Sequence, residues 1–153
     1  MRFDPKVKPV KEHLRPSATE KRKAIGEKVA RLLAAEFIRE IYHFEWLANF
    51  VMVPKKDDSL RMCIDFNHIN RAYPKDHFPL PRIDQIVDST AGCERLSFLD
   101  ACSGDHQIRL YGPNEIKKTF ITPFGCFCYV TMPFGLKNAS DTFMRMIQKC
   151  LLT

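Results

Sequence analysis

Apolar residues recur at helical spacing in the first quarter of the chain. They fall at i, i+4, i+7, i+8 and i+12 and so share one face of a helix: Ile25, Val29, Leu32, Leu33 and Phe37. Just before them, residues 17–20 have the pattern of a capping box, in which the Ser17 hydroxyl and the Glu20 carboxylate each satisfy a free backbone amide. These features predict a helix from Ser17 to about Glu40 that packs on the core through its apolar face.

Two apolar runs around a polar turn predict a β-hairpin. The first run covers residues 50–53. In the second, apolar residues at 60, 62, 64 and 66 alternate with polar or small ones, which is the period of a half-buried strand. The turn between them, residues 55–59, reads Lys-Lys-Asp-Asp-Ser. The hairpin tip is therefore expected to be rich in lysine, with Arg61 and Asp65 paired on the polar face.

Prolines and glycines divide the rest of the chain into short elements. Three prolines predict an extended segment over residues 71–82, followed by a short helix at 83–89. Strands are predicted at residues 95–101, 107–110, 116–122 and 127–131. Helical spacing returns from Phe143 onward, with Asn138 or Ser140 as the N-cap. This helix is still running at Thr153, so we expect that position not to be a natural domain boundary.

Composition places the chain among ordinary globular domains. It has 153 residues, of which 45% are hydrophobic and 27% charged. The apolar runs are too short to span a bilayer, and the N-terminus lacks the apolar segment of a secretory signal. We therefore expect an intracellular protein, cytoplasmic or nuclear, not secreted and with no membrane partner. Its six cysteines are then interpreted as reduced thiols.

The basic surplus gathers at the N-terminus. The formal net charge is +6, and residues 1–28 hold nine Lys or Arg against four acids. Residues 1–16 contain three prolines without periodicity and are predicted to form a basic extended arm, ahead of a domain at 17–153. Such an arm could be merely solvated, or it could contact the phosphates of a nucleic acid. The sequence favours neither interpretation.

Seven blocks of sequence, in this order, resemble the reverse transcriptase of gypsy-type long-terminal-repeat retrotransposons. They occupy residues 45–49, 53–57, 60–66, 78–84, 98–104, 106–108 and 132–139, reading EWLAN, VPKKD, LRMCIDF, FPLPRID, FLDACSG, HQI and MPFGLKNA. The resemblance implies an α+β fold, the fingers and first half of the palm of a right-hand polymerase, with an antiparallel palm sheet backed by helices. It also implies a truncated chain: the rest of the palm, the thumb, the RNase H domain and the integrase would belong to the missing remainder of the polyprotein.

The same resemblance assigns roles to individual residues. It implies RNA-directed DNA synthesis on an RNA or DNA template-primer from deoxynucleoside triphosphates, with two Mg²⁺ ions at the reacting phosphate. Asp100 would be the catalytic carboxylate and a metal ligand, with the backbone carbonyl of Ala101 beside it. The residues that would bind the nucleotide are Lys55, Arg61, Ser103, Gly104, Asp105, Phe134 and Gly135. A strand-end acid, a solvated hairpin tip and a core-packing loop are the alternative interpretations of these positions.

Lys55 and Arg61 have the chemistry for the triphosphate, because a lysine is a mobile point charge and an arginine a planar fork for phosphate oxygens. Phe134 offers a flat apolar surface to base and sugar, on a rigid turn set by Pro133 and Gly135.

Two departures from the family pattern bear on activity. Asp105 stands where the family usually has an aromatic residue beneath the sugar, so we expect impaired nucleotide binding or lost sugar discrimination. A second metal-ligand role for Asp105 is the alternative. The family's paired carboxylates, in an aromatic-x-Asp-Asp motif, are absent: the sole Asp-Asp pair is 57–58, at the hairpin tip. We therefore expect residues 1–153 alone to lack polymerase activity.

Three interpretations of the whole chain stay open. It is a fragment of a transposon polymerase, a non-catalytic remnant that binds nucleic acid, or a product that folds poorly. Half a palm would leave a sheet edge and apolar surface exposed, which favours aggregation.

Overall fold

The first helix is shorter than the apolar spacing predicts. The computed structural model describes residues 4, 6–57, 59–98, 100–101 and 103–151. Helix α1 spans Thr19–Ala34, and its N-cap, Ala18, has no side-chain cap, so the predicted capping box is wrong. The helix ends because Glu36 adopts a positive φ of 55°, while the amides of Glu36 and Phe37 bond back to the carbonyls of Leu33 and Leu32. The chain then enters strand β1, Ile38–Glu40.

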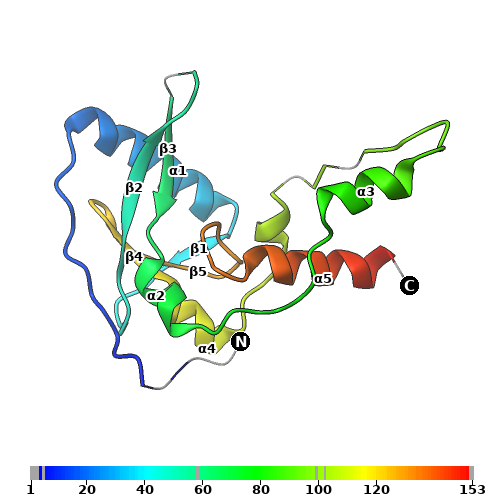
Figure 1. Ribbon diagram of the computed structural model, residues 1–153. Coiled ribbons are helices and arrows are strands. Elements are labelled where there is room, and N and C mark those ends of the chain that lie inside the picture. The colour runs from blue at the N-terminus through cyan, green and yellow to red at the C-terminus, as the bar shows by residue number, and fades with distance from the viewer. Residues whose placement is uncertain (1–3, 5, 58, 99, 102, 152–153) are drawn as a thin grey trace.

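A five-stranded sheet stands against α1 (Figure 1), in the order β1-β5-β4-β2-β3. Its remaining strands are β2 (Ala48–Pro54), β3 (Leu60–Ile64), β4 (Thr119–Thr122) and β5 (Gly125–Tyr129). The predicted hairpin is confirmed, since β2 and β3 pair in antiparallel register with Phe50 opposite Ile64. The other pairs are antiparallel too, except that β2 runs parallel to β4. The hairpin tip projects from one end of the sheet (Figure 1).

Six further helices, most of them short, lie among the described residues outside α1 and the sheet. They are α2 (Asn67–Ala72), α3 (Ile83–Thr90), η1 (Gly104–Gln107), α4 (Gly112–Glu115), η2 (Ile116–Lys118) and α5 (Ala139–Leu151). The helix predicted at 83–89 is confirmed as α3, and α5 begins directly after Asn138. The pattern did not indicate α2.

Two of the four later strands are wrong as predicted, and two are shifted. The described residues of 95–101 form no strand, because no neighbouring segment pairs with them; Leu99 lies outside the described residues. Residues 107–110 contribute one isolated bridge, from Arg109 to Thr131. The segment 116–122 begins with η2 before it becomes β4, and the segment predicted at 127–131 forms β5 two residues earlier.

The hydrophobic core lies between α1 and the sheet. Ile25 and Phe120 are fully buried there, and the Phe120 ring lies 6.0 Å from that of Phe127 and 5.3 Å from that of Tyr129. α5 lies away from this core (Figure 1), and α3 buries no residue. No helix in the described ranges combines the length and apolarity needed to cross a bilayer.

The N-terminal segment runs along the sheet instead of leaving it (Figure 1). The amide of Glu12 donates to the Leu47 carbonyl at 2.9 Å, and the amide of Leu47 donates to the Val10 carbonyl at 3.0 Å. Val7 and Val10 pack against the core. Arg15 forms ion pairs with Glu12 and Asp65, at 3.2 and 3.6 Å. The division at residue 16 stays a prediction, but several charges of this segment have partners within the chain.

Candidate nucleotide-binding groove

A groove of about 770 Å³ opens between the β2–β3 hairpin, α1 and the loop that follows β5. It brings together four of the predicted nucleotide-binding residues, Lys55, Arg61, Phe134 and Gly135. These positions lie far apart in the sequence, so the fold itself assembles them. The volume is in the range of about 300–1,000 Å³ that is usual for small-molecule sites.

Strand β3 contributes Arg61 to the groove, together with the strand's other residues from Leu60 to Ile64. Met62 and Ile64 point into the core, whereas Arg61 and Cys63 are exposed. The predicted Arg61–Asp65 pair is wrong, since Asp65 instead pairs with Arg15 at 3.6 Å. Among the residues that the structure describes, Arg61 has no ion-pair partner and remains available for a phosphate.

The hairpin tip is held in shape by its own side chains. The Lys55 amide donates to the Ser59 carbonyl at 2.8 Å and closes the turn. Asp57 accepts hydrogen bonds from the Ser59 hydroxyl at 2.7 Å and from the Ser59 amide at 3.2 Å. These bonds, with the hydroxyl bond first, hold the pKa of Asp57 below its usual value, and the Lys55 charge adds to the effect. Within the described ranges no acid forms an ion pair with Lys55, which lines the groove.

The loop carrying Phe134 is fixed from below by Asn70 of α2. Gly135 adopts a φ of 88°, which residues with a side chain rarely tolerate. Its carbonyl accepts a hydrogen bond from Asn70 Nδ2 at 2.7 Å, and Asn70 Oδ1 accepts from the Lys137 amide at 2.9 Å. The Phe134 ring remains 65% exposed. Sequence reasoning missed Asn70, because α2 carries too little apolar periodicity to predict.

His106 lies at the floor of the groove between aromatic rings. Its ring stacks 4.5 Å from Phe37 and 5.8 Å from Tyr129, and it meets the edge of Phe134 at 5.6 Å. Nδ1 lies 3.3 Å from the Thr131 hydroxyl. Burial lowers the pKa of His106, and the positive charge of Lys28 lowers it further. The buried imidazole packs against the Phe134 ring and supports it.

The predicted metal residues lie outside this groove. Asp100 and Ala101 are exposed, and the Ala101 carbonyl already accepts a hydrogen bond from the Gly104 amide at 3.1 Å. Ser103 adopts a left-handed conformation with φ of 50° and leads into η1. Asp105 is half-buried, and burial raises the pKa of its carboxyl, opposed by His106. Asp100, Ala101, Ser103, Gly104 and Asp105 are not among the described residues that line the groove.

The residues present do not fit a complete two-Mg²⁺ site. Such a site needs several carboxylates around the same point. Among the described residues, no group of three His, Cys, Asp or Glu side chains is placed to hold a metal ion. Asp100 could contribute one ligand, and further ligands would have to come from outside the described chain.

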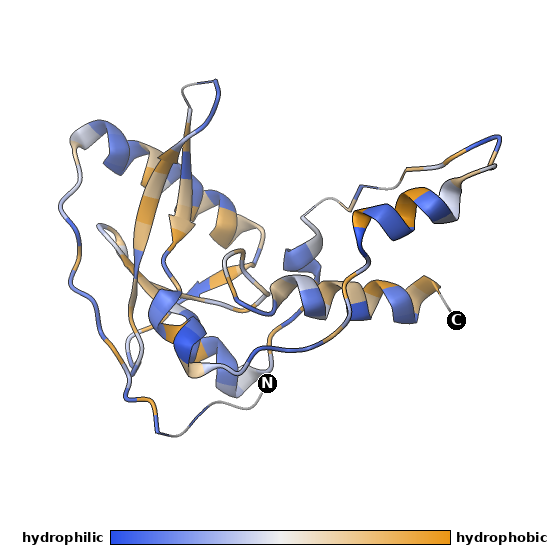
Figure 2. Cartoon of the chain, in the orientation of Figure 1, coloured by the Kyte–Doolittle hydropathy of each residue, from blue (hydrophilic) through white to orange (hydrophobic). Residues whose placement is uncertain are grey.

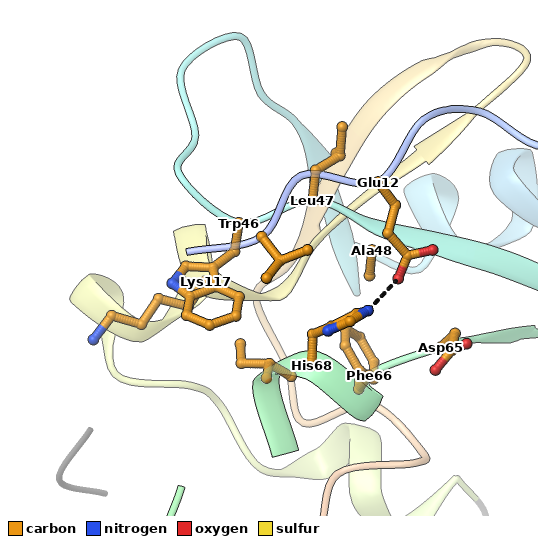
Figure 3. Close-up of a pocket in the computed structure, with 10 residues that line it drawn as sticks. Glu12, Trp46, Leu47, Ala48, Asp65, Phe66, His68 and Lys117 are labelled. Carbon is orange, nitrogen blue, oxygen red and sulfur yellow. Dashed lines mark ion pairs between the residues drawn. The ribbon is translucent and has the colours of Figure 1, made fainter. Parts of the chain in front are cut away.

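A second, much smaller cavity lies beneath the N-terminal segment (Figure 3). Its 10 Å³ is about the volume that one water molecule needs. His68 points toward Glu12 there, with Nε2 3.7 Å from the carboxylate. This cavity is a packing seam between the segment and α2, too small for a nucleotide.

Comparison with known proteins identifies the family. The family model described as reverse transcriptase (RNA-dependent DNA polymerase) matches residues 53–152. The chain therefore belongs to the reverse transcriptase family.

Curated relatives agree with this assignment. An RNA-directed DNA polymerase homolog of Oenothera berteroana is 39% identical over 93 residues, which cover 61% of this chain and 66% of that protein. The retrovirus-related Pol polyprotein from transposon 412 of Drosophila melanogaster is 39% identical over 103 residues, 63% of this chain but 8% of the polyprotein. The transposon Tf2-3 polyprotein of Schizosaccharomyces pombe is 31% identical over 86% of this chain and 10% of its own length. The chain thus spans just under two thirds of the first relative and a small part of the polyproteins.

Solved structures agree on the fold. The foamy viral protease-reverse transcriptase in complex with an RNA/DNA hybrid superposes with a TM-score of 0.80 at 15% identity, over 98% of this chain and 20% of that one. The native prototype foamy virus enzyme gives the same TM-score at 18% identity. The predicted α+β reverse transcriptase fold is confirmed.

Proposed function

We propose that the chain is the nucleotide-holding part of a gypsy-type retrotransposon reverse transcriptase. The observation that carries the proposal is the groove in which Lys55, Arg61, Phe134 and Gly135 meet. In this proposal Lys55 and Arg61 hold the triphosphate of an incoming nucleotide, and Phe134 packs against its nucleoside. The foamy viral relative, in complex with an RNA/DNA hybrid, supports a template-primer as the second partner.

We propose further that Asp100 and the Ala101 carbonyl contribute to a Mg²⁺ site that this chain does not complete. When bound, the ions would supply charge neutralisation at the reacting phosphate. What the described residues can do without them is bind and orient a nucleotide. We therefore expect no DNA synthesis from residues 1–153.

Primer extension tests the proposed inactivity. The purified chain is incubated with an RNA template, a DNA primer, deoxynucleoside triphosphates and Mg²⁺. No extension is expected. Extension that disappears in the Asp100→Asn variant would contradict the proposal, because it would mean that this chain completes its own catalytic site.

Substitution of Asp105 in a full-length polymerase that carries this segment tests whether this position affects nucleotide use. Asp105→Tyr restores the aromatic residue of the family pattern and removes a half-buried acid. We expect about tenfold more DNA synthesis, the size of one well-placed packing contact. Asp105→Asn is the control that removes the charge alone. Equal synthesis by the wild type and Asp105→Tyr would show that position 105 does not govern nucleotide use.

A non-catalytic role in binding nucleic acid is the second candidate. The exposed lysines of the N-terminal segment and the hairpin tip favour it. In that case affinity for an RNA/DNA hybrid should fall steeply with salt, because binding releases counterions from phosphates. Affinity that is insensitive to salt would count against this candidate.

A further inference from the structure

Helix α1 forms a second wall of the groove. Four of its residues line it, at i, i+3, i+4 and i+7: Ala24, Glu27, Lys28 and Arg31. This spacing places them in one stripe about 10 Å long, at 1.5 Å per residue. The stripe is distinct from the face that enters the core, which carries Ile25, Val29 and Leu32. Part of α1 therefore faces the groove instead of packing.

The charge of this wall is mainly positive. Glu27 is the one acid among the described residues that line the groove, and its carboxylate lies 3.8 Å from the Arg31 guanidinium. Lys28 has no ion pair within the described part of the chain, and its charge reaches His106 at the groove floor. With Lys55 and Arg61 on the hairpin, the groove is flanked by four cations and one acid that is already paired.

We infer that Lys28 and Arg31 are binding residues for the terminal phosphates of a nucleoside triphosphate, opposite Lys55 and Arg61. The inference rests on the proposed function, since it extends the same groove. A triphosphate suits this arrangement better than a nucleic-acid backbone, because a phosphodiester carries one charge per phosphate along an extended strand. A terminal triphosphate concentrates more charge within one groove, and the exposed Phe134 ring offers a surface to the attached nucleoside.

Calorimetric titration with inorganic tripolyphosphate tests the inference. EDTA is present, so that binding reports on the cations of the chain itself. The double variant Lys28→Ala/Arg31→Ala is compared with Arg22→Ala/Lys23→Ala, which removes the same two charges from the same helix at exposed positions outside the groove. Circular dichroism verifies that each variant folds, and Lys28→Gln/Arg31→Gln replaces the alanine pair if it does not.

We expect affinity about tenfold weaker in Lys28→Ala/Arg31→Ala, the net contribution of a charged hydrogen bond, and less than twofold weaker in the control. Equal losses in the two variants would overturn the inference, because they would reflect net charge alone. So would unchanged affinity in Lys28→Ala/Arg31→Ala.

A third variant separates this inference from the proposed function. If Lys55→Ala/Arg61→Ala weakens binding while Lys28→Ala/Arg31→Ala does not, the α1 wall is refuted and the nucleotide groove stands. If no variant and no wild-type titration shows binding, both fail. Displacement of tripolyphosphate by an unphosphorylated single-stranded oligonucleotide at equal phosphate concentration would also refute a triphosphate site.

Discussion

The groove and the segment that carries Asp100 differ in how the chain supports them. The groove residues rest on α1, the sheet and the Asn70 contacts, around a core in which Ile25 and Phe120 are fully buried. The other region consists of α3 and the described residues of 95–101, and it makes little packing contact with the core: α3 buries no residue. Phe98 is 89% exposed and Ile83 is 79% exposed. Figure 2 shows α3 and the coil that follows it standing apart from the sheet, with apolar and polar residues intermixed.

The difference in packing follows the proposed roles, nucleotide binding in one region and catalysis in the other. Residues proposed to hold a nucleotide are positioned by packing within this chain, because the elements that carry them share its core. The proposed catalytic carboxylate lies among exposed apolar side chains, which gain stability only when another surface covers them. The residues proposed to bind a nucleotide are therefore held by packing within this chain, whereas the described residues around Asp100 are largely exposed.

Matched phenylalanine truncations in the two regions give the largest expected effect. Phe120→Ala removes a fully buried ring from the core and should lower the free energy of unfolding by about 3–5 kcal/mol. Phe98→Ala removes a ring that is 89% exposed and should change it by less than about 0.5 kcal/mol. Urea denaturation measures both. Similar losses would mean that the two regions are equally packed in solution.

Local patterns predicted only part of the region that packs on itself. The two-residue period placed Arg61 on the open face of the hairpin, and the family resemblance brought in Phe134 and Gly135. The end of α1 was missed because the apolar spacing continues to Phe37, whereas pairing of Ile38 with Tyr129 draws the chain into the sheet. No local pattern could predict where the helix gives way to the strand, because the strand forms by pairing with residues far along the chain.

The strand predicted at 95–101 is wrong for the opposite reason. Its residues suit a strand, but a strand forms only beside a partner, and the described chain offers none.

The burial of Lys118 could not be predicted from the sequence either. A lysine beside Lys117 is expected to be solvated, yet it is 1% exposed and donates hydrogen bonds to the Tyr73 hydroxyl and the Asn114 carbonyl.

Lys118 is buried in the well-packed region, and its titration should make the stability of the fold depend on pH. Burial, with a smaller effect of Lys117, lowers its pKa from 10.5 to about 8. Between these values the folded chain binds fewer protons than the unfolded chain, so folding stability rises with pH. The free energy of unfolding of the wild type, minus that of Lys118→Met, should rise by about 2 kcal/mol from pH 7 to 9.5.

Urea denaturation of the wild type and Lys118→Met across this pH range makes the measurement. The subtraction cancels other groups that titrate in both proteins. A difference that stays constant, or falls with rising pH, would mean that Lys118 is solvated and that this side of the molecule is looser than the structure shows.

The smallest expected effect comes from the contact that links the Asp100 segment to α5. A Cβ at Gly104 would lie 2.7 Å from the Phe143 ring, so Gly104→Ala must displace either the ring or η1. Since Phe143 is only half-buried and can move, we expect a loss of about 1 kcal/mol in the free energy of unfolding. Thermal denaturation should detect it as a lower Tm.

Gly112→Ala is the matched control, because a Cβ there would meet nothing within 4 Å. It should leave stability unchanged or raise it by about 0.4–1 kcal/mol, as alanine restricts the unfolded chain. If Gly104→Ala behaves like this control, the Phe143 contact does not constrain η1. The residues from Asp100 to η1 would then not be held by the Phe143 ring of α5. The difference in packing between the two regions would be larger than the structure indicates.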